Sequence, residues 1–444
     1  MMKKGHLIHL ILIIIATLLY FGANIQRVAV PGAIFDTLQQ DLMTNPATIT
    51  ALGASFMYIY AISQLVVGLL VSRYGGYRVI TAGAVIFTIG GLIFPVSHFI
   101  WLLYLSRALV GLGSATFYLG IIHETKNVVT HNNFGIALSL ILFVGYFGGI
   151  IANAPLVLCV HEIGWRYTFM CIGAFALILT ALFFVFKLFI QKPQTNKEVK
   201  FNFDAYKTVL KKPSNLILYG FGCLNYGIYY LLQTVIGKKF LEDFCRFEVM
   251  KAAVILSLMG FLYAVAGPIL AYLSKMLLNR RTIFLKITAL NTLFTIIFVI
   301  GCLIFDFKTP IISVLFCTIA FFACMSPLLV PLIHDINGAK ESSVATCIMT
   351  SCFYFVVAIL GNITGHVLNF FEPNNVNGVM VYSNQAYITI FAILLILSVI
   401  STTCVFFMKE SQKTIRFLKM CKYMETKYGE HWHDKYEHDL YSGM

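Results

Sequence analysis

The sequence predicts an all-α membrane protein with twelve transmembrane helices arranged in two similar halves. Its 444 residues are 59% hydrophobic and only 11% charged, whereas soluble domains carry about 25% charged residues. Mean hydropathy is +0.83, and apolar runs of about 20 residues, the length that crosses a bilayer, recur along the chain. A glycine-bearing basic hairpin at 68–78 has a degenerate copy at 267–281. That recurrence indicates two related halves.

Turn and charge signals between the apolar runs delimit the individual spans. The expected spans lie near residues 7–34, 47–71, 79–97, 100–122, 134–158, 166–189, 214–236, 249–273, 282–304, 310–333, 343–369 and 385–408. The chain then divides into a first bundle at 1–190, a polar linker at 191–213, a second bundle at 214–408 and a basic tail at 409–444. Lys3 and Lys4 before an apolar run imitate a secretory signal, but further spans follow, so we expect the first span to be retained.

Basic residues in the short loops predict the orientation, because such loops stay in the cytoplasm. One face of the predicted bundle collects Lys3, Lys4, Arg73, Arg78, Lys126, the linker, Lys275, Arg280, Arg281, Lys340, Lys409, Lys413, Arg416 and Lys419. Both termini are therefore expected in the cytoplasm. The loop after the seventh span is an exception, with Lys238, Lys239, Arg246 and Lys251 beside acidic residues.

Composition also excludes several classes of protein. The net charge of +13 follows the loops rather than one soluble face, so it indicates topology and no nucleic-acid partner. The eleven cysteines lie mostly inside apolar runs without Cys-x-x-Cys pairing, which predicts neither disulfides nor a zinc site. His431, His433 and His438 of the tail suit either a metal or a solvated polar segment, and we favour the latter. We expect no metal and no cofactor.

The hairpin at 68–78 resembles the signature loop of the major facilitator superfamily, Gly-x-Leu-x-Asp-Arg-x-Gly-Arg-Arg. Gly68, Leu70, Arg73 and Gly75 match, Ser72 stands at the acidic position, Gly76 and Tyr77 replace the paired basic residues, and Arg78 follows one place later. In that family the aspartate helps to latch the two halves on the cytoplasmic side. The latch here must use other residues, and we expect Glu124 to pair with Arg73 or Arg78.

A second motif resembles the fourth helix of the same family, Arg-x-x-x-Gly-x-Gly-x-Ala, matched at Arg107, Gly111, Gly113 and Ala115. The resemblance implies that Arg107 either bonds backbone carbonyls of the first helix or takes part in proton coupling, and both roles stay open. Tyr118 shares the helix face of Arg107 and is a candidate cavity residue. The resemblance implies the major facilitator fold, with two six-helix bundles that open alternately to each side of the membrane.

Polar side chains inside the first span form a stripe, because Tyr20, Asn24, Arg27 and Pro31 are spaced 4, 3 and 4 residues apart. An intramembrane arginine is costly and marks function by default. A guanidinium that lines a cavity favours a carboxylate or phosphate. Alternatively, Arg27 snorkels to the interface or pairs with Asp36 or Asp41.

The seventh span carries a matching stripe, Asn225, Tyr229 and Gln233. As the first and seventh helices are equivalent in the family fold, both stripes are expected to face one central cavity. Asn362 and His366 of the eleventh span and Tyr58 and Gln64 of the second are further substrate-binding candidates, with interhelical hydrogen bonding as the alternative for isolated asparagines and simple packing for His366. Carboxylates are absent from the interiors of the apolar runs.

Together these observations predict a secondary transporter of a small polar solute, with an organic anion such as a carboxylate as the leading substrate. A carrier of amino acids, sugars or drugs, or a receptor of the same fold, is the alternative. The sequence lacks a nucleotide-binding loop or a catalytic constellation, which argues against a pump or an enzyme. A proton or sodium ion is the expected coupling ion, and a monomer in a bacterial inner membrane is the expected state.

Overall fold

The computed structural model describes residues 4–129, 131–190, 203–277, 280–337, 339–376, 379–408 and Glu410. The predicted tail beyond Glu410, including its histidines, and residues 191–202 of the predicted linker lie outside this range. The first bundle comprises α1 (Lys4–Ala29), the short turn η1 (Gly32–Ile34), α2 (Phe35–Asp41), α3 (Pro46–Tyr74), α4 (Gly76–Val96), α5 (Ile100–Val128), α6 (His131–Ile151), α7 (Ala154–Ile163) and α8 (Trp165–Leu188).

The second bundle follows the connecting helix α9 (Phe203–Lys211). It comprises α10 (Pro213–Leu231), the π-helical turn η2 (Leu232–Ile236), α11 (Gly237–Asp243), α12 (Val249–Met276), α13 (Arg281–Ile304), α14 (Ile311–Ala323), α15 (Ser326–Ile336), α16 (Ala339–Phe370), the strands β1 (Asn374–Val376) and β2 (Val379–Val381), and α17 (Asn384–Phe407). The strands pair antiparallel, with Asn375 opposite Met380.

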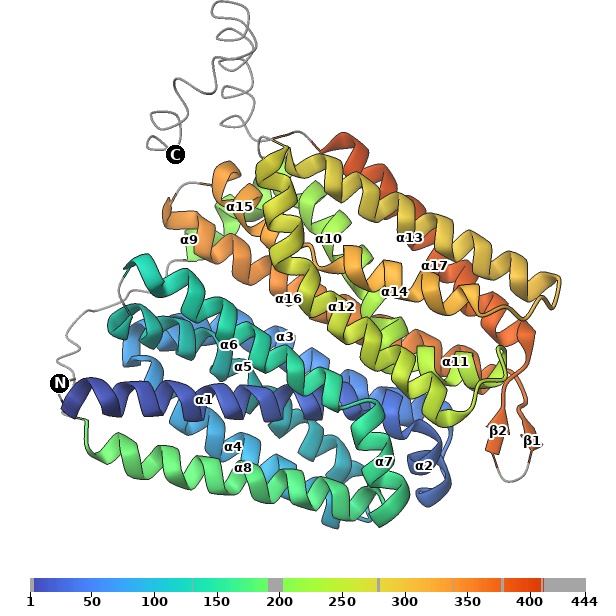
Figure 1. Cartoon of the computed structure of the whole chain (residues 1–444), viewed down its shortest axis with the longest axis horizontal. Helices are drawn as coiled ribbons and strands as arrows, with labels where there is room; N and C mark the ends of the chain where they lie inside the picture. The colour runs from blue at the N-terminus through green and yellow to red at the C-terminus, as the bar shows by residue number, and fades with distance from the viewer. Residues whose placement is uncertain are drawn as a thin grey trace, which may run out of the picture.

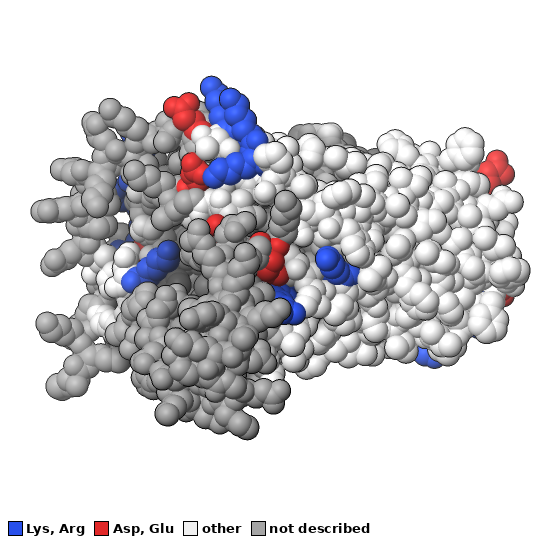
Figure 2. Space-filling model, turned by 90° about the horizontal axis from the view of Figure 1, so that it is seen from above, with Lys and Arg blue, Asp and Glu red and all other residues white. Residues whose placement is uncertain are grey.

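The two bundles lie side by side, with α3 packed along α16 and α6 against α12 (Figure 1). The start of α1 and the end of α17 lie at one end of the molecule, which we call the terminus end, and the β1–β2 hairpin, α2 and α11 lie at the other, the hairpin end (Figure 1). On the face shown in Figure 2 most of the coloured charged side chains gather toward one side, and the described surface beyond them is broadly uncharged, with only a few charged side chains. Such a surface suits lipid contact.

Local chemistry explains where the helices begin and end. The side chain of Asn45 accepts a hydrogen bond from the Thr48 N–H at 2.9 Å, and Pro46 occupies the first position of α3; both are favoured at helix starts. Gly75 alone separates α3 from α4 and has φ +83°. A residue with a side chain is strained in that conformation, which is why the predicted hairpin requires glycine.

Three predicted spans are not the uninterrupted helices that the apolar runs suggested. The fifth bends by 44° between α6 and α7, where Pro155 lies at the start of α7; the tenth is interrupted before Pro327. Proline lacks an N–H and clashes with the preceding turn. The seventh widens into the π-helical turn η2 before α11. The first span ends at Ala29, five residues before its predicted limit, and η1 and α2 follow.

Ten helices among the described residues are long and apolar enough to cross a membrane, and the bent pair α6–α7 supplies an eleventh. The remaining predicted span is α10 with η2, whose tyrosines and asparagines make it more polar than its neighbours. This polar helix lies against α16 and α17 in the second bundle. The polar side chains of α10, among them Asn225 and Tyr229, are buried inside the protein.

Candidate functional site

Arg27 is buried at the contact between the bundles, with 6% of its surface exposed. It projects from α1 and donates to the Tyr354 hydroxyl of α16 at 2.6 Å and to the Asn24 side-chain oxygen. Its guanidinium carbon lies 5.4 Å from the ring centre of Tyr354 and 5.6 Å from that of Tyr230 on α10. These are cation–π distances. Arg27 thus connects both halves through hydroxyls and aromatic faces.

The positive charge of Arg27 is not neutralised by a carboxylate in the described part of the chain. Its Nε atom is buried without a hydrogen-bond partner there. The alternative partners named from the sequence are engaged elsewhere, since Asp36 pairs with Lys239 at 2.9 Å and Asp41 with Arg166 at 2.9 Å. A buried, unpaired guanidinium is costly, so an anion that reaches it gains a strong interaction.

Two small cavities adjoin Asn24 and Arg27. The larger has a volume of about 30 Å³ and the smaller about 10 Å³; each is close to the space of one water molecule. The larger is lined by Asn24, Arg27, Val28, Tyr146, Gly149, Tyr226, Tyr229, Tyr230, Gln233, Gly260 and Tyr263. In this conformation side chains nearly fill the centre, so an organic solute requires the bundles to move apart.

Tyrosine is the most frequent residue type in the wall around Arg27. The Tyr229 and Tyr263 rings stack with centres 4.9 Å apart, and Tyr60 meets Tyr354 edge-on at 4.6 Å. Tyr226 stacks on Tyr230 at 5.4 Å. Tyrosine offers an apolar face and a hydroxyl that donates or accepts. The arrangement is suited to hold a small solute bearing both apolar and anionic groups.

The structure brings several predicted residues together and separates others. The larger cavity is lined by Asn24, Arg27, Tyr229 and Gln233, among others. Tyr118 stacks on Tyr20, which lines the smaller cavity, with ring centres 5.9 Å apart. Asn225 lies behind the cavity, where its side chain accepts from Thr292 at 3.1 Å and donates to Ser401 at 3.4 Å. The contacts of Asn225 are therefore hydrogen bonds between helices, the alternative to substrate binding that the sequence left open.

The candidates of the second and eleventh spans also lie away from this cavity. Asn362 donates to the Tyr58 hydroxyl at 3.2 Å, a contact between α16 and α3. Gln64 donates to the Ala115 carbonyl at 3.4 Å inside the first bundle. His366 is exposed on α16. Its expected place in the cavity was wrong for this conformation, because the helix turns that side chain outward.

Sequence reasoning missed the tyrosines on which the site depends, namely Tyr60, Tyr146, Tyr226, Tyr230, Tyr263 and Tyr354. Tyr226 and Tyr230 neighbour the predicted stripe and repeat at four residues, so they carried a usable signal. Tyr354 has only the hydroxyl residues Thr350 and Ser351 at helical spacing before it, which is too weak a signal to mark a site. Its contact with Arg27 joins residues 327 positions apart, which periodicity cannot reveal.

The predicted latch at the terminus end has different contacts from those expected. Glu124 accepts from the backbone N–H of Tyr77 at 3.1 Å and lies 3.4 Å from His123, so its expected pairing with Arg73 or Arg78 was wrong. Ser72 donates to the Gly68 carbonyl at 2.9 Å in its own helix. Arg73 lies over the Tyr74 ring at 5.3 Å. Away from this end, near the middle of α3, the bundles are joined by Ser351, which donates to the Ala61 carbonyl at 2.8 Å.

Arg107 is 1% exposed, and its three guanidinium nitrogens find no hydrogen-bond partner among the described residues. The guanidinium instead lies 4.9 Å from the Phe56 ring centre and 5.8 Å from that of Phe94. The suggested bonds to backbone carbonyls of the first helix are not formed. The coupling alternative stays a prediction.

Buried ion pairs join the bundles at the hairpin end. Lys239 Nζ of α11 lies 2.9 Å from Asp36 of α2 and 3.1 Å from Asp243. Asp243 also accepts from the Tyr382 backbone N–H at 2.9 Å. Burial by itself would lower the pKa of Lys239, but the charges of Asp36 and Asp243 outweigh it and raise that pKa. Two of the four basic residues that looked exceptional for an outward loop, Lys238 and Lys239, thus form internal ion pairs, whereas Arg246 and Lys251 are exposed.

Comparisons with known proteins agree on one family. The sequence profile of the Major Facilitator Superfamily matches residues 12–362. A chloroplastic sodium-dependent phosphate transport protein 1 of Arabidopsis thaliana is 26% identical over 174 residues, 38% of this chain and 34% of that protein. The uncharacterized transporter YybO of Bacillus subtilis strain 168 is 31% identical over 156 residues, 34% of this chain and 35% of that protein. The match spans about a third of each relative.

Solved structures with the same fold cover nearly the whole chain. A bacterial homologue of the human lysosomal transporter Spinster, in an inward-facing and unoccupied conformation, superposes with a TM-score of 0.68 at 14% identity, covering 91% of this chain and 98% of that one. A mutant of the nucleoside transporter NupG gives 0.66 at 14% identity, covering 89% and 100%. The predicted twelve-helix architecture is confirmed. The chain is an integral membrane protein and belongs to the Major Facilitator Superfamily.

Proposed function

We propose that this transporter is a secondary carrier of a small organic anion, with Arg27 as the counter-charge of the substrate. The observation that carries the proposal is a buried guanidinium, without a carboxylate partner in the described residues, at the boundary of the two bundles. An anion bound there interacts with α1, α10 and α16 at once. Its binding therefore depends on how the bundles are placed, as alternating access requires.

The tyrosines indicate which groups the substrate has besides its negative charge. The Tyr354 hydroxyl already accepts a hydrogen bond from Arg27, and its ring lies against the guanidinium. Tyr229, Tyr230 and Tyr263 line the adjoining cavity. A carboxylate on a small, partly apolar skeleton matches one fixed cation within such a wall. Inorganic phosphate is the second candidate, because the Arabidopsis relative is a sodium-dependent phosphate transport protein and a probable anion transporter of rice is 26% identical over 161 residues.

We also propose how the chain is oriented in the membrane. Arg73, Arg78 and Arg281 all lie at the terminus end, which supports a cytoplasmic location for both termini by the positive-inside rule. The hairpin end, where Lys239 and Asp36 meet, then faces outward. For a bacterial protein, we infer from this orientation a location in the inner membrane.

Proteoliposome uptake tests the proposal. Labelled carboxylates, phosphate, amino acids and sugars are offered to the wild type, Arg27→Gln, Arg27→Lys and the exposed control Lys207→Gln, each checked for folding by its melting temperature. Imposed proton and sodium gradients, applied separately, identify the driving ion. We expect saturable anion uptake that Arg27→Gln abolishes and Lys207→Gln leaves unchanged. Uptake of a neutral solute that survives Arg27→Gln refutes the anion proposal but not the carrier fold.

A further inference from the structure

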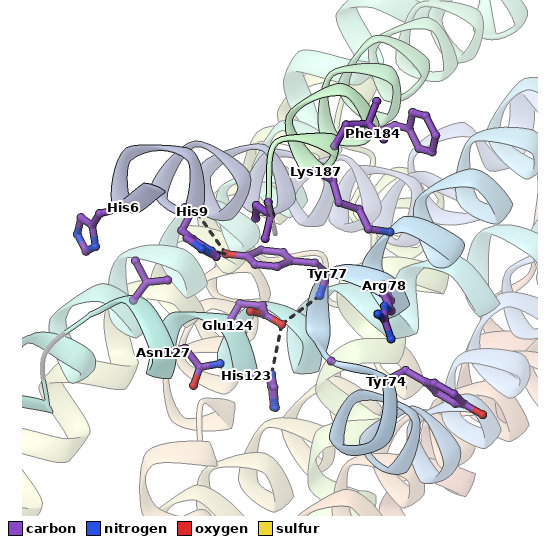
Figure 3. A pocket seen from close by; sticks show the side chains of 14 residues that line it. His6, His9, Tyr74, Tyr77, Arg78, His123, Glu124, Asn127, Phe184 and Lys187 are labelled. Carbon is purple, nitrogen blue, oxygen red and sulfur yellow. Dashed lines mark hydrogen bonds and ion pairs between the residues drawn. The ribbon is translucent and has the colours of Figure 1, made fainter. Parts of the chain in front are cut away.

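A second, much larger chamber lies inside the terminus end of the first bundle. Its volume is about 700 Å³, and α1, α4, α5 and α8 contribute to its wall (Figure 3). The chamber lies at the terminus end. It is separate from the cavities beside Arg27, because it shares no lining residue with them. Volumes of this size are typical of small-molecule sites.

The chamber is rich in positive charge. Arg78 of α4 and Lys187 of α8 both line it and lie close enough for their charges to repel one another. Figure 3 shows both side chains on one side of Tyr77, with His9 on the other. Lys187 donates to Thr81 at 2.8 Å, a neutral partner that leaves its charge uncompensated. Placing two cations together is unfavourable unless an anion joins them.

The single described carboxylate of the lining does not neutralise this pair. Glu124 accepts from the Tyr77 backbone N–H at 3.1 Å and lies 3.4 Å from His123. The hydrogen bond places Glu124 at the first turn of α4, where the helix dipole favours negative charge. His9 and His123 also line the chamber, and Nδ1 of His9 lies 3.0 Å from the Tyr77 hydroxyl.

The lining also has an apolar border. Phe184 and Leu188 of α8 contribute to the wall and are 52% and 70% exposed, so they face the lipid as well. A ligand held here has its anionic group near Arg78 and Lys187 and apolar surface beside α8. Arg78 lies in the first turn of α4, where a helix N-terminus favours an anion, and a guanidinium matches the geometry of phosphate. Lys187, in the last turn of α8, adds a second positive charge.

We propose that this chamber binds a phosphate-bearing anion, with Arg78 and Lys187 as its ligands. The phosphate belongs either to a lipid headgroup that enters beside α8 or to a soluble phosphomonoester from the terminus side. Both sources present the same dianionic or monoanionic group to the same two cations. By neutralising their repulsion, the ligand ties α4 to α8 and stabilises the first bundle.

Binding to the full-length chain in nanodiscs tests this assignment. One arm adds glycerol 3-phosphate, with glycerol as control, to discs of phosphatidylcholine. The other compares phosphatidylcholine discs with discs that contain phosphatidic acid. Melting temperature is followed in both arms, and labelled glycerol 3-phosphate or phosphatidic acid gives the affinity. The variants are Arg78→Gln, Arg78→Gln with Lys187→Gln, the charge-preserving Lys187→Arg, the exposed basic control Lys211→Gln, and Arg27→Gln.

We expect a higher melting temperature with at least one phosphate source and about tenfold weaker binding in the double variant. Lys187→Arg, Lys211→Gln and Arg27→Gln should bind as the wild type does, which separates this chamber from the central site. A response to phosphatidic acid alone identifies the lipid source, and a response to glycerol 3-phosphate identifies the soluble one. No response to either source, an equal response in the double variant, or a response lost only in Arg27→Gln overturns the proposal. If the double variant does not fold, the single variant Arg78→Gln replaces it, because Arg78 is exposed. Binding by Arg78→Gln that equals wild-type binding then overturns the proposal.

Discussion

Lys239 of the second bundle lies 2.9 Å from Asp36 of the first, at the hairpin end, and is itself only 2% exposed. The same ammonium lies 3.1 Å from Asp243. The closure of the two bundles at this end therefore includes a desolvated charge cluster rather than apolar packing alone. In the proposed transport cycle, opening toward this side requires the separation of Lys239 from Asp36.

Removal of the lysine should destabilise the protein strongly. Lys239→Met leaves Asp243, also buried, without its cation, and a broken buried pair costs about 3–5 kcal/mol. Asp36→Asn should cost less, because Lys239 keeps Asp243. Denaturation in detergent compares these variants with Asp41→Asn, whose pair with Arg166 is partly exposed and should contribute below about 1 kcal/mol. Equal effects of Lys239→Met and Asp41→Asn would show that the buried pair is not special.

The same lysine predicts an alkaline limit to stability. Its folded-state pKa is raised above the ordinary value of 10.5, so folding favours the protonated form. The resulting stabilisation is complete below the unfolded pKa and is lost as pH rises through the folded one. The difference in melting temperature between wild type and Lys239→Met should stay constant from pH 7 to about 10 and shrink above it. A difference that grows in alkaline buffer contradicts this.

Tyr354→Phe isolates the hydroxyl that Arg27 contacts. The ring remains, but the 2.6 Å hydrogen bond to the guanidinium is lost, and hydrogen bonds to charged groups contribute about 1.5–3 kcal/mol. We expect a lower free energy of unfolding, measured by denaturation. We also expect a changed KM for anion uptake, measured in proteoliposomes. Tyr272→Phe, on the exposed side of α12, is the control and should change neither. Unaltered uptake by Tyr354→Phe would remove this hydroxyl from the proposed site.

Arg107→Met separates the two roles left open for that arginine. The guanidinium is buried between Phe56 and Phe94 without a hydrogen-bond partner in the described residues, so an apolar side chain of similar length should leave stability unchanged or raise it. If Arg107 serves coupling, uptake driven by an ion gradient should fall while the melting temperature holds. A marked loss of stability together with intact uptake assigns Arg107 to structure instead.

How much of this was predictable differs between the fold and the site. The basic hairpin, the need for Gly75 and most span limits follow from composition and periodicity, which are local. The breaks near Pro155 and Pro327 also have a local cause, but an apolar run hides it because hydropathy does not record a missing N–H. The contact of Glu124 could not be predicted from the sequence, because its partner is the backbone N–H of Tyr77. Every residue except proline has such a donor, so no sequence pattern marks it.

The sequence by itself determined that this is a polytopic membrane protein of two similar halves, and that Arg27 lies on a polar helix face with Asn24. These properties follow from hydropathy and from the 3.6-residue period of a helix. Only the tertiary structure decided that Arg27 meets Tyr354 and Tyr230, that Lys239 reaches Asp36, and that Arg78 and Lys187 share a chamber. Each of these pairs joins different helices, and the packing of helices depends on the shape of whole surfaces rather than on any local pattern.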